Sequence, residues 1–209
     1  MEQVSTKKRI LIEALTLFSE KGYDAVSVGQ IAEAVGIKAP SLYKHYKNKQ
    51  DIFDAILDEM KERYEQQTAA MHLNGFDAEK DVKVYENISD ESLIRMGRDL
   101  FLYFLHDEYV SRFRKMLTIE QYRSRELADL YAKQYVDDTL SYQSMLFHLL
   151  SEMGMVEQET PQIMAVHFYA PIYMLLTLCD RQPEREREAL QILEQHIRQF
   201  NRLYGRKEK

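Results

Sequence analysis

The chain has little material for covalent cross-links and little for tight turns. Cys179 is the single cysteine, which excludes both an intramolecular disulfide and a thiolate zinc cluster and fits a reducing compartment. Seven Gly and four Pro in 209 residues supply few of the turns that a many-stranded sheet needs. Leu, Glu, Lys, Gln, Ala and Met, which favour helices, are abundant. The composition therefore predicts an all-α protein, and its 45% of hydrophobic residues are ample for a packed core.

A secretory signal and a clear membrane span are also missing. Residues 1–5 contain no apolar run of the kind that a signal peptide carries. The most apolar stretch, residues 163–179, contains His167 and Pro171 and falls short of the roughly 20 residues that cross a bilayer. We therefore expect a cytoplasmic protein in which this stretch is a buried helix.

Charge is unevenly distributed along the chain. Residues 1–50 hold eight Lys/Arg against five Asp/Glu, a net charge of +3, which leaves −9 for the rest of a chain whose net charge is −6. Within this first part, residues 36–50 contain four lysines and no acid. Such a cluster attracts polyanions, so the two parts of the chain are expected to have different functions.

Four helices are predicted in the first third of the chain. Apolar residues at helical spacing predict a helix over 6–21. Ser27 and Gln30 have the spacing of a capping box, so a second short helix begins directly after this serine. A turn containing glycine then leads to a third short helix over 40–46, and a fourth helix runs from about 49 to 67.

The remaining two thirds of the chain are also predicted to be helical. Residues 71–89 show no sustained periodicity and form the longest connection, with room for one short helix. Further helices are predicted over 90–106, 108–122, 124–153, 161–180 and 184–204. We therefore predict two domains: a helix-turn-helix DNA-binding domain over 1–48, and an effector-sensing and dimerisation domain over 49–209.

Two short helices joined by a tight turn, with the second helix basic, form the arrangement that enters a major groove. Lysines neutralise phosphates, while small and polar side chains on the exposed face of the second helix can approach base edges. In this chain that mixture is supplied by Lys38, Ala39, Pro40, Ser41, Tyr43, Lys44 and His45.

Residues 26–53, which read VSVGQIAEAVGIKAPSLYKHYKNKQDIF, closely resemble the signature of the tetracycline-repressor (TetR) family. The resemblance extends from about residue 10 to residue 57, roughly a quarter of the chain. Beyond it the sequence is similar to the family only in being helical and of the right length. Lys38 departs from the pattern, because members usually place serine or threonine there, so the third helix lacks its ordinary cap.

The family resemblance also assigns roles to single residues. It implies that Ser27 and Tyr43 contact phosphates, although a core aromatic remains the alternative for Tyr43. It implies that Ala39, Ser41 and Lys44 face the bases, with His45 beside them. Lys49, at the amino end of the fourth helix, is implied to contact phosphate.

A regulator that binds two half-sites needs a self-association surface. The last two helices carry more apolar surface than one protomer readily covers, and the resemblance implies a four-helix bundle built from these two helices of each protomer. An ordinary monomer core is the alternative. The expected dimer contacts are Phe168, Ile172, Leu175, Leu176, Leu193, Ile197 and Phe200.

The second domain is also rich in aromatic and Met residues that can surround a small-molecule effector. Most of these are expected to be plain core. The expected pocket residues are Phe101, Phe104, Phe113, Met116, Arg123, Tyr142, Phe147 and His167.

Enzyme motifs are missing from the sequence. It contains no Glu-x-x-His pair, no His-Glu-x-x-His, no Gly-rich phosphate loop and no nucleophile elbow. His148 and Glu152 share a helix face, but two ligands do not make a metal site. We expect a homodimeric repressor with double-stranded operator DNA as its partner, an unidentified small-molecule effector, and no catalytic residue, cofactor, metal or membrane. A DNA-binding dimer without an effector and an all-helical enzyme are the alternatives.

Overall fold

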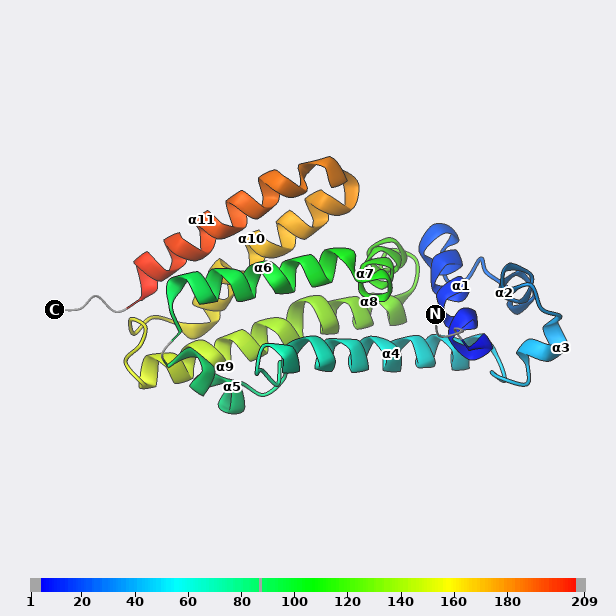
Figure 1. Cartoon of the computed structure of the whole chain (residues 1–209), viewed down its shortest axis with the longest axis horizontal. Coiled ribbons are helices and arrows are strands. Elements are labelled where there is room, and N and C mark those ends of the chain that lie inside the picture. Colours follow the sequence, from blue (N-terminus) through cyan, green and yellow to red (C-terminus); the bar gives the residue numbers. More distant parts are fainter. Residues whose placement is uncertain (1–4, 87, 206–209) are drawn as a thin grey trace. The chain divides into compact units, whose positions relative to one another are not determined.

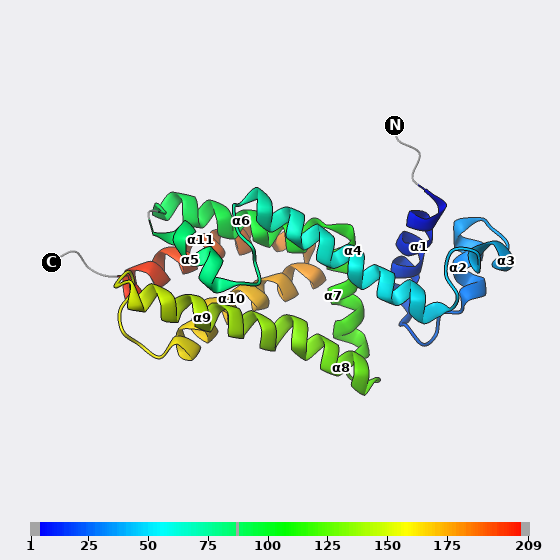
Figure 2. The same cartoon turned by 90° about the horizontal axis from the view of Figure 1, so that it is seen from below.

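The computed structural model describes residues 5–86 and 88–205, and the elements named within them are helices (Figures 1 and 2). The only pairing of strand type recorded in this part is an isolated bridge between Val156 and Gly205. The α-helices are α1 (Thr6–Lys21), α2 (Val28–Val35), α3 (Ala39–Leu42), α4 (Lys49–Ala70), α5 (Ala78–Tyr85), α6 (Asp90–His106), α7 (Glu108–Glu120), α8 (Arg125–Ala132), α9 (Asp138–Glu152), α10 (Pro161–Arg181) and α11 (Glu186–Tyr204). The all-α prediction is confirmed.

Local caps explain why several predicted boundaries are confirmed. The Ser5 hydroxyl accepts from the amide of Lys8 at the start of α1, and Gly22 ends that helix with φ 87°. Ser89 caps α6 in the same way, by accepting from Ser92. The predicted short helix between 71 and 89 is α5.

Two predicted helices differ from the structure in detail. The helix expected over 124–153 consists of α8 and α9 joined by a π-helical turn, η1 (Lys133–Asp137). The last predicted helix starts slightly later, because a 3₁₀ turn, η2 (Pro183–Arg185), precedes α11. The spacing of apolar residues in a sequence does not distinguish a π-helical or 3₁₀ turn from an α-helix.

The chain divides into two compact units. The N-terminal unit comprises the residues up to Arg63 together with Glu108–Tyr131, and the C-terminal unit comprises Tyr64–Asp107 together with the residues from Ala132 onward. Helix α4 therefore continues from one unit into the other. This grouping adds α7 and most of α8 to the helix-turn-helix, whereas the functional boundary near residue 48 stays a prediction.

Helix α7 contributes to the core of the N-terminal unit. Rings from three helices and the α1–α2 turn follow one another: Phe18 lies 5.0 Å from Tyr23, Tyr23 lies 5.0 Å from Phe53, and Phe53 lies 5.8 Å from Phe113, between ring centroids. Met116, also on α7, is fully buried. The short helices α2 and α3 are held by burial of their own apolar side chains, as α2 packs on α1 and α3 packs on α2, because helices of four to eight residues are unstable alone.

The C-terminal unit is a helical bundle in which α10 packs against α9, α11 and α6, while α5 packs on α9 (Figure 2). One cluster gathers Phe147, Phe168 and Phe200 from α9, α10 and α11. A second cluster joins α6 to α10 and α11. There a glycine on α6 allows close packing, because a Cβ at Gly97 would lie 2.6 Å from Cδ1 of Ile197.

The expected dimer contacts on α10 and α11 mostly belong to these internal clusters. The side chains of five of them are buried within the single protomer: Leu175, Leu176, Leu193, Ile197 and Phe200. Phe168 and Ile172 are partly buried against the same clusters. We therefore reassign the five buried residues to the protomer core, because a side chain that its own chain covers has no surface left for a partner. For Phe168 and Ile172, which keep some exposed surface, the dimer contact stays a prediction.

Helix α10 is also less covered than expected. It is the one helix in the described ranges that is long and apolar enough to cross a membrane by length and composition, with a mean hydropathy of 1.4 and only 28% of that window buried. A core helix of a soluble protein meets the same criteria. The inner face of α10 is core as predicted, but its outer face carries exposed Ile163, Val166 and Met174.

Candidate nucleic-acid interface

The amino end of α2 has the capping box that the sequence predicts. The amide of Gln30 donates to the Ser27 hydroxyl over 3.2 Å, and the Ser27 amide donates to Oε1 of Gln30 over 2.8 Å. Two amides at the amino end of the helix are thereby satisfied. Ser27 itself remains exposed, so it holds the end of α2 in place while it faces solvent.

A left-handed glycine makes the turn between α2 and α3. Gly36 has φ 77° and ψ 31°, and its amide donates to the carbonyl of Glu33 over 2.9 Å. The guanidinium of Arg9 in α1 donates to the carbonyl of Val35 over 2.6 Å and so satisfies the carboxyl end of α2. This role of Arg9 could not be predicted from the sequence, because no local pattern connects residues 26 positions apart.

Helix α3 is shorter than predicted. It is α-helical over Ala39–Leu42, and the next turn tightens, with the amide of His45 bonding to the carbonyl of Leu42 over 2.8 Å. Lys38 occupies the cap position without a side-chain hydrogen bond, as expected from its departure from the family pattern. Pro40 stands in the first turn, where a missing amide hydrogen is tolerated. In both views α3 lies at the periphery of the N-terminal unit, on the side away from α7.

The structure separates the packing residues of this motif from the predicted DNA-facing ones. The side chains that pack the motif together are buried: Ile31, Ala32, Val35, Leu42 and Tyr46. The expected DNA contacts are all exposed or half-exposed: Ser27, Lys38, Ala39, Pro40, Ser41, Tyr43, Lys44, His45 and Lys49. Tyr43, for which a core position was the alternative, is 52% exposed. One continuous surface on and around α3 therefore presents lysines, a phenol, an imidazole and small side chains to solvent.

Lys49 has partners within the protein. Its ammonium donates to the carbonyl of Tyr23 over 2.9 Å and lies 4.3 Å from the centre of the Tyr23 ring. The Tyr23 hydroxyl in turn donates to Gln50 over 3.0 Å. Lys49 thus ties the start of α4 to the α1–α2 turn. The phosphate contact that the resemblance implies for it stays a prediction.

The comparisons with known proteins agree with this geometry. Residues 10–56 match the family model described as bacterial regulatory proteins, tetR family. A probable HTH-type transcriptional regulator of Bacillus subtilis, YttP, is 24% identical over 97% of this chain and 89% of its own length. The family resemblance of residues 10–56 is therefore confirmed.

Two further matches cover very different shares of the chain. The TetR-family match to IcaR of Staphylococcus epidermidis, a negative transcriptional regulator of a biofilm operon, is 51% identical but spans 47 residues, which is 22% of this chain and 25% of IcaR. The solved complex of SmeT with triclosan has the same fold over 97% of this chain and 92% of its own, with a TM-score of 0.68 and 20% identity; SmeT is the repressor of a Stenotrophomonas maltophilia efflux pump. This chain is accordingly a DNA-binding transcriptional regulator.

The expected effector-pocket residues do not gather in one place. Phe113 and Met116 lie in the core of the N-terminal unit, and Arg123 is exposed there, 3.4 Å from the Glu120 carboxylate. We therefore remove these three from the pocket, because the packing of α7 on α1 places them outside the C-terminal unit.

The other five expected pocket residues lie in the C-terminal unit. Phe101 and Phe147 are buried in its two clusters. His167 is exposed and hydrogen-bonded to the Tyr204 hydroxyl over 2.5 Å. Phe104 and Tyr142 are half-buried, and Phe104 stacks on Tyr64 with centroids 6.0 Å apart.

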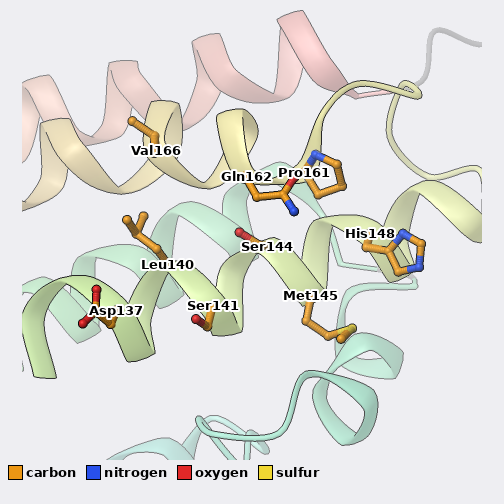
Figure 3. Close-up of a pocket in the computed structure, with 9 residues that line it drawn as sticks. All are labelled: Asp137, Leu140, Ser141, Ser144, Met145, His148, Pro161, Gln162 and Val166. Atoms are coloured by element: carbon orange, nitrogen blue, oxygen red, sulfur yellow. The ribbon is translucent and has the colours of Figure 1, made fainter. Parts of the chain in front are cut away.

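An open groove of about 730 Å³ runs between α9 and α10 in the C-terminal unit (Figure 3). Asp137 and Val166 lie at one end of it, and His148 and Pro161 lie at the other. Its lining consists of Asp137, Leu140, Ser141, Ser144, Met145, His148, Pro161, Gln162 and Val166. None of the eight expected pocket residues is among them. In the part of the chain that the structure describes, no group of three or more His, Cys, Asp or Glu is placed to hold a metal.

Proposed function

We propose that this TetR-family regulator is a cytoplasmic repressor that binds a palindromic operator as a homodimer and is released by a small-molecule effector. The observation that carries the proposal is the exposed surface on and around α3, where Lys38, Tyr43 and Lys44 flank the small residues of the helix and no acid occurs between positions 36 and 50. A short helix flanked by basic residues in this way fits a major groove and neutralises its phosphates.

A dimer is required because one α3 reads one half-site. Two-fold related helices about 34–36 Å apart reach successive major grooves on one side of the duplex. The exposed apolar side chains on the outer face of α10 favour such self-association.

Effector control is proposed for the C-terminal unit. SmeT, whose fold this chain shares, has been solved with triclosan bound. In this chain the half-buried Phe104, Tyr142 and neighbouring aromatic side chains offer contacts for an apolar ligand. An effector that binds better to a dimer with unsuitable half-site spacing shifts the population away from the operator-bound form.

Selection of fragments from the genomic DNA of the source organism tests the proposal. The purified protein should retain a small set of duplexes with two-fold symmetric sequences, and a reporter placed behind such an operator should be silenced. A thermal-shift ligand screen should then find compounds that stabilise the protein and release the operator. Operator binding without any releasing compound would support the effector-free alternative, and turnover without duplex binding would support an enzyme.

A further inference from the structure

One wall of the groove between α9 and α10 is polar along its length. Asp137, Ser141, Ser144 and His148 are four, three and four positions apart, so they share one face of α9. Figure 3 shows them in this order along the helix, with apolar side chains of α10 across from both ends of the groove. Among the described residues, none of these four side chains has a hydrogen bond or ion pair with another group. Their hydrogen-bonding capacity is therefore open to a ligand.

The groove suits an elongated ligand. Asp137 and His148 are eleven positions apart, which corresponds to about 16 Å along the helix axis at roughly 1.5 Å per residue. The volume of about 730 Å³ lies within the usual range of small-molecule sites. Leu140 and Val166, from opposite walls, provide apolar contacts. A ligand that uses the whole polar wall must therefore be a linear chain with polar groups at both ends and apolar segments between them.

The segment that builds the groove contains acids but no bases. Residues 134–180 hold six Asp/Glu and no Lys or Arg. The preceding Lys133 is bonded to Asp138 over 2.7 Å, whereas Asp137 has no ion pair among the described residues. Asp137 is also the last residue of the π-helical turn η1, a rare element that is frequent at functional sites. A carboxylate without a counter-charge therefore lies at this end of the groove.

Further acids flank the opposite end. Glu152 follows His148 by one helical turn on α9, and Glu159 precedes Pro161 by two residues. Both acids are exposed. Carboxylates at the two ends attract cations to the groove and repel anions. A single metal ion does not suit this arrangement, because the described residues contain no group of three His, Cys, Asp or Glu placed to hold one.

We propose that the groove binds a linear aliphatic polyamine that lies along α9, with one terminal ammonium on Asp137 and the other near His148. Ammonium groups only donate hydrogen bonds, whereas a carboxylate, two serine hydroxyls and a neutral imidazole can all accept them. The contact between an ammonium and the Asp137 carboxylate is the strongest of these, because both groups are charged. The methylene segments of the ligand pack on Leu140 and Val166.

This site is separate from the aromatic contacts proposed above for an apolar effector. Tyr142, also on α9, donates to Asp81 of α5, so it points toward a different neighbour from the serines of the groove. The groove thus adds a second kind of ligand to the regulator. The inference goes beyond the proposed function, because it requires neither operator binding nor a compound that releases the operator.

Calorimetric titration of the full-length protein with spermine at low ionic strength tests the site. Asp137→Asn should lower the affinity roughly tenfold, because it removes the charge at one end of the groove. The Asp137 side chain makes no capping hydrogen bond at the start of α9, so folding should be unaffected. Ser141→Lys should lower the affinity at least as much, since the new ammonium lies one turn from Asp137 and pairs with its carboxylate. The matched control, Asp99→Asn, removes an exposed acid from α6 of the same unit, outside the groove, and should bind spermine like the wild type.

The shape of the ligand provides a second test. Putrescine, a shorter diamine, cannot reach both ends of the groove and should bind roughly tenfold more weakly than spermine. Hexaamminecobalt(III), a compact trivalent cation, should bind weakly and equally to the wild type and to Asp137→Asn. Thermal unfolding without ligand should give each variant the wild-type Tm. The comparison of ligands uses the wild type alone, so it decides the question even if a variant is unstable.

The outcomes separate this inference from the proposed function. Binding of spermine no tighter than that of hexaamminecobalt(III), or an equal loss in Asp99→Asn, would show a general attraction to an acidic surface and overturn the polyamine site. Absence of spermine binding in both calorimetry and equilibrium dialysis would also overturn it, and operator binding would be unaffected by that result. A wild-type protein that binds spermine in the groove but no duplex DNA would overturn the proposed function and leave the polyamine site standing.

Discussion

The hydroxyl of Tyr142 on α9 donates to the buried carboxylate of Asp81 on α5 over 2.7 Å. The same carboxylate accepts from the backbone amides of Asn74 and Gly75, so it fixes the turn after α4 to the rest of the C-terminal unit. Asp81 is 1% exposed. A charge buried to this degree depends on its hydrogen-bond donors.

Tyr142→Phe is therefore expected to lower the free energy of unfolding by about 1–3 kcal/mol, because it removes one donor from a buried carboxylate. Urea denaturation at neutral pH measures the change. Tyr122→Phe removes a hydroxyl from an 86% exposed ring and serves as the control. Equal stability of the two variants would show that Tyr142 does not support Asp81.

Alkaline pH should weaken the same region. Burial raises the pKa of Tyr64 from its ordinary value of 10.0 to about 12, and the Asp81 carboxylate adds to the shift. Burial also raises the pKa values of Tyr85 and Tyr142. Because the folded-state pKa exceeds the unfolded one, this stability is fully present below about pH 10 and is lost as pH rises toward 12.

The measurement is the free energy of unfolding between about pH 8 and about pH 11.5. Tyr64→Phe should start from a lower neutral value, because its hydrogen bond to the Gly75 carbonyl is gone, but should decline less steeply with pH. A decline as steep as that of the wild type would mean that Tyr64 does not contribute to the alkaline loss.

Two glycines of the N-terminal unit should respond differently to alanine. Gly22, at φ 87° and ψ 154°, lies in a region that glycine alone adopts readily, and a Cβ there would collide with the Glu120 carboxylate. Gly36 has φ 77° but open space around a Cβ. Gly36→Ala should cost about 1–2 kcal/mol of stability and Gly22→Ala more than that. If thermal unfolding showed a larger loss of stability for Gly36→Ala than for Gly22→Ala, this explanation of the two glycines would be wrong.

Ser27 should have two separable functions. Ser27→Asp keeps a side-chain acceptor for the Gln30 amide, so stability should change by less than about 0.5 kcal/mol, yet its charge should repel phosphate and weaken operator binding. Ser27→Ala loses the cap and should destabilise the protein by about 1 kcal/mol. Denaturation and operator titration of both variants check this. Undiminished operator affinity of Ser27→Asp would place Ser27 away from the DNA.

The features of this fold that the sequence predicts are those whose physical cause lies in nearby residues. The α2 capping box involves residues three positions apart, and the ends of α1 and α6 depend on adjacent caps, so all were predictable. Which neighbour covers an apolar face is not local. Phe113 was assigned to the pocket because nothing in its own helix shows that it packs on Phe53, sixty positions earlier. Likewise Met174 and Leu175 are adjacent and equally apolar, but only packing decides that Met174 is exposed and Leu175 buried.

Operator titration over a range of salt concentrations tests the central claim, that the exposed face of α3 contacts duplex DNA. Lys44→Ala should bind the selected operator more weakly and reduce the slope of log affinity against log salt by about 0.9, the value of one phosphate contact. Tyr43→Ala should also weaken binding, and both variants should remain dimers. Lys83→Ala, which removes the same charge from α5 in the other unit, should leave affinity and slope unchanged. Identical titrations of wild type and Lys44→Ala, or no duplex binding at low salt, would contradict the account.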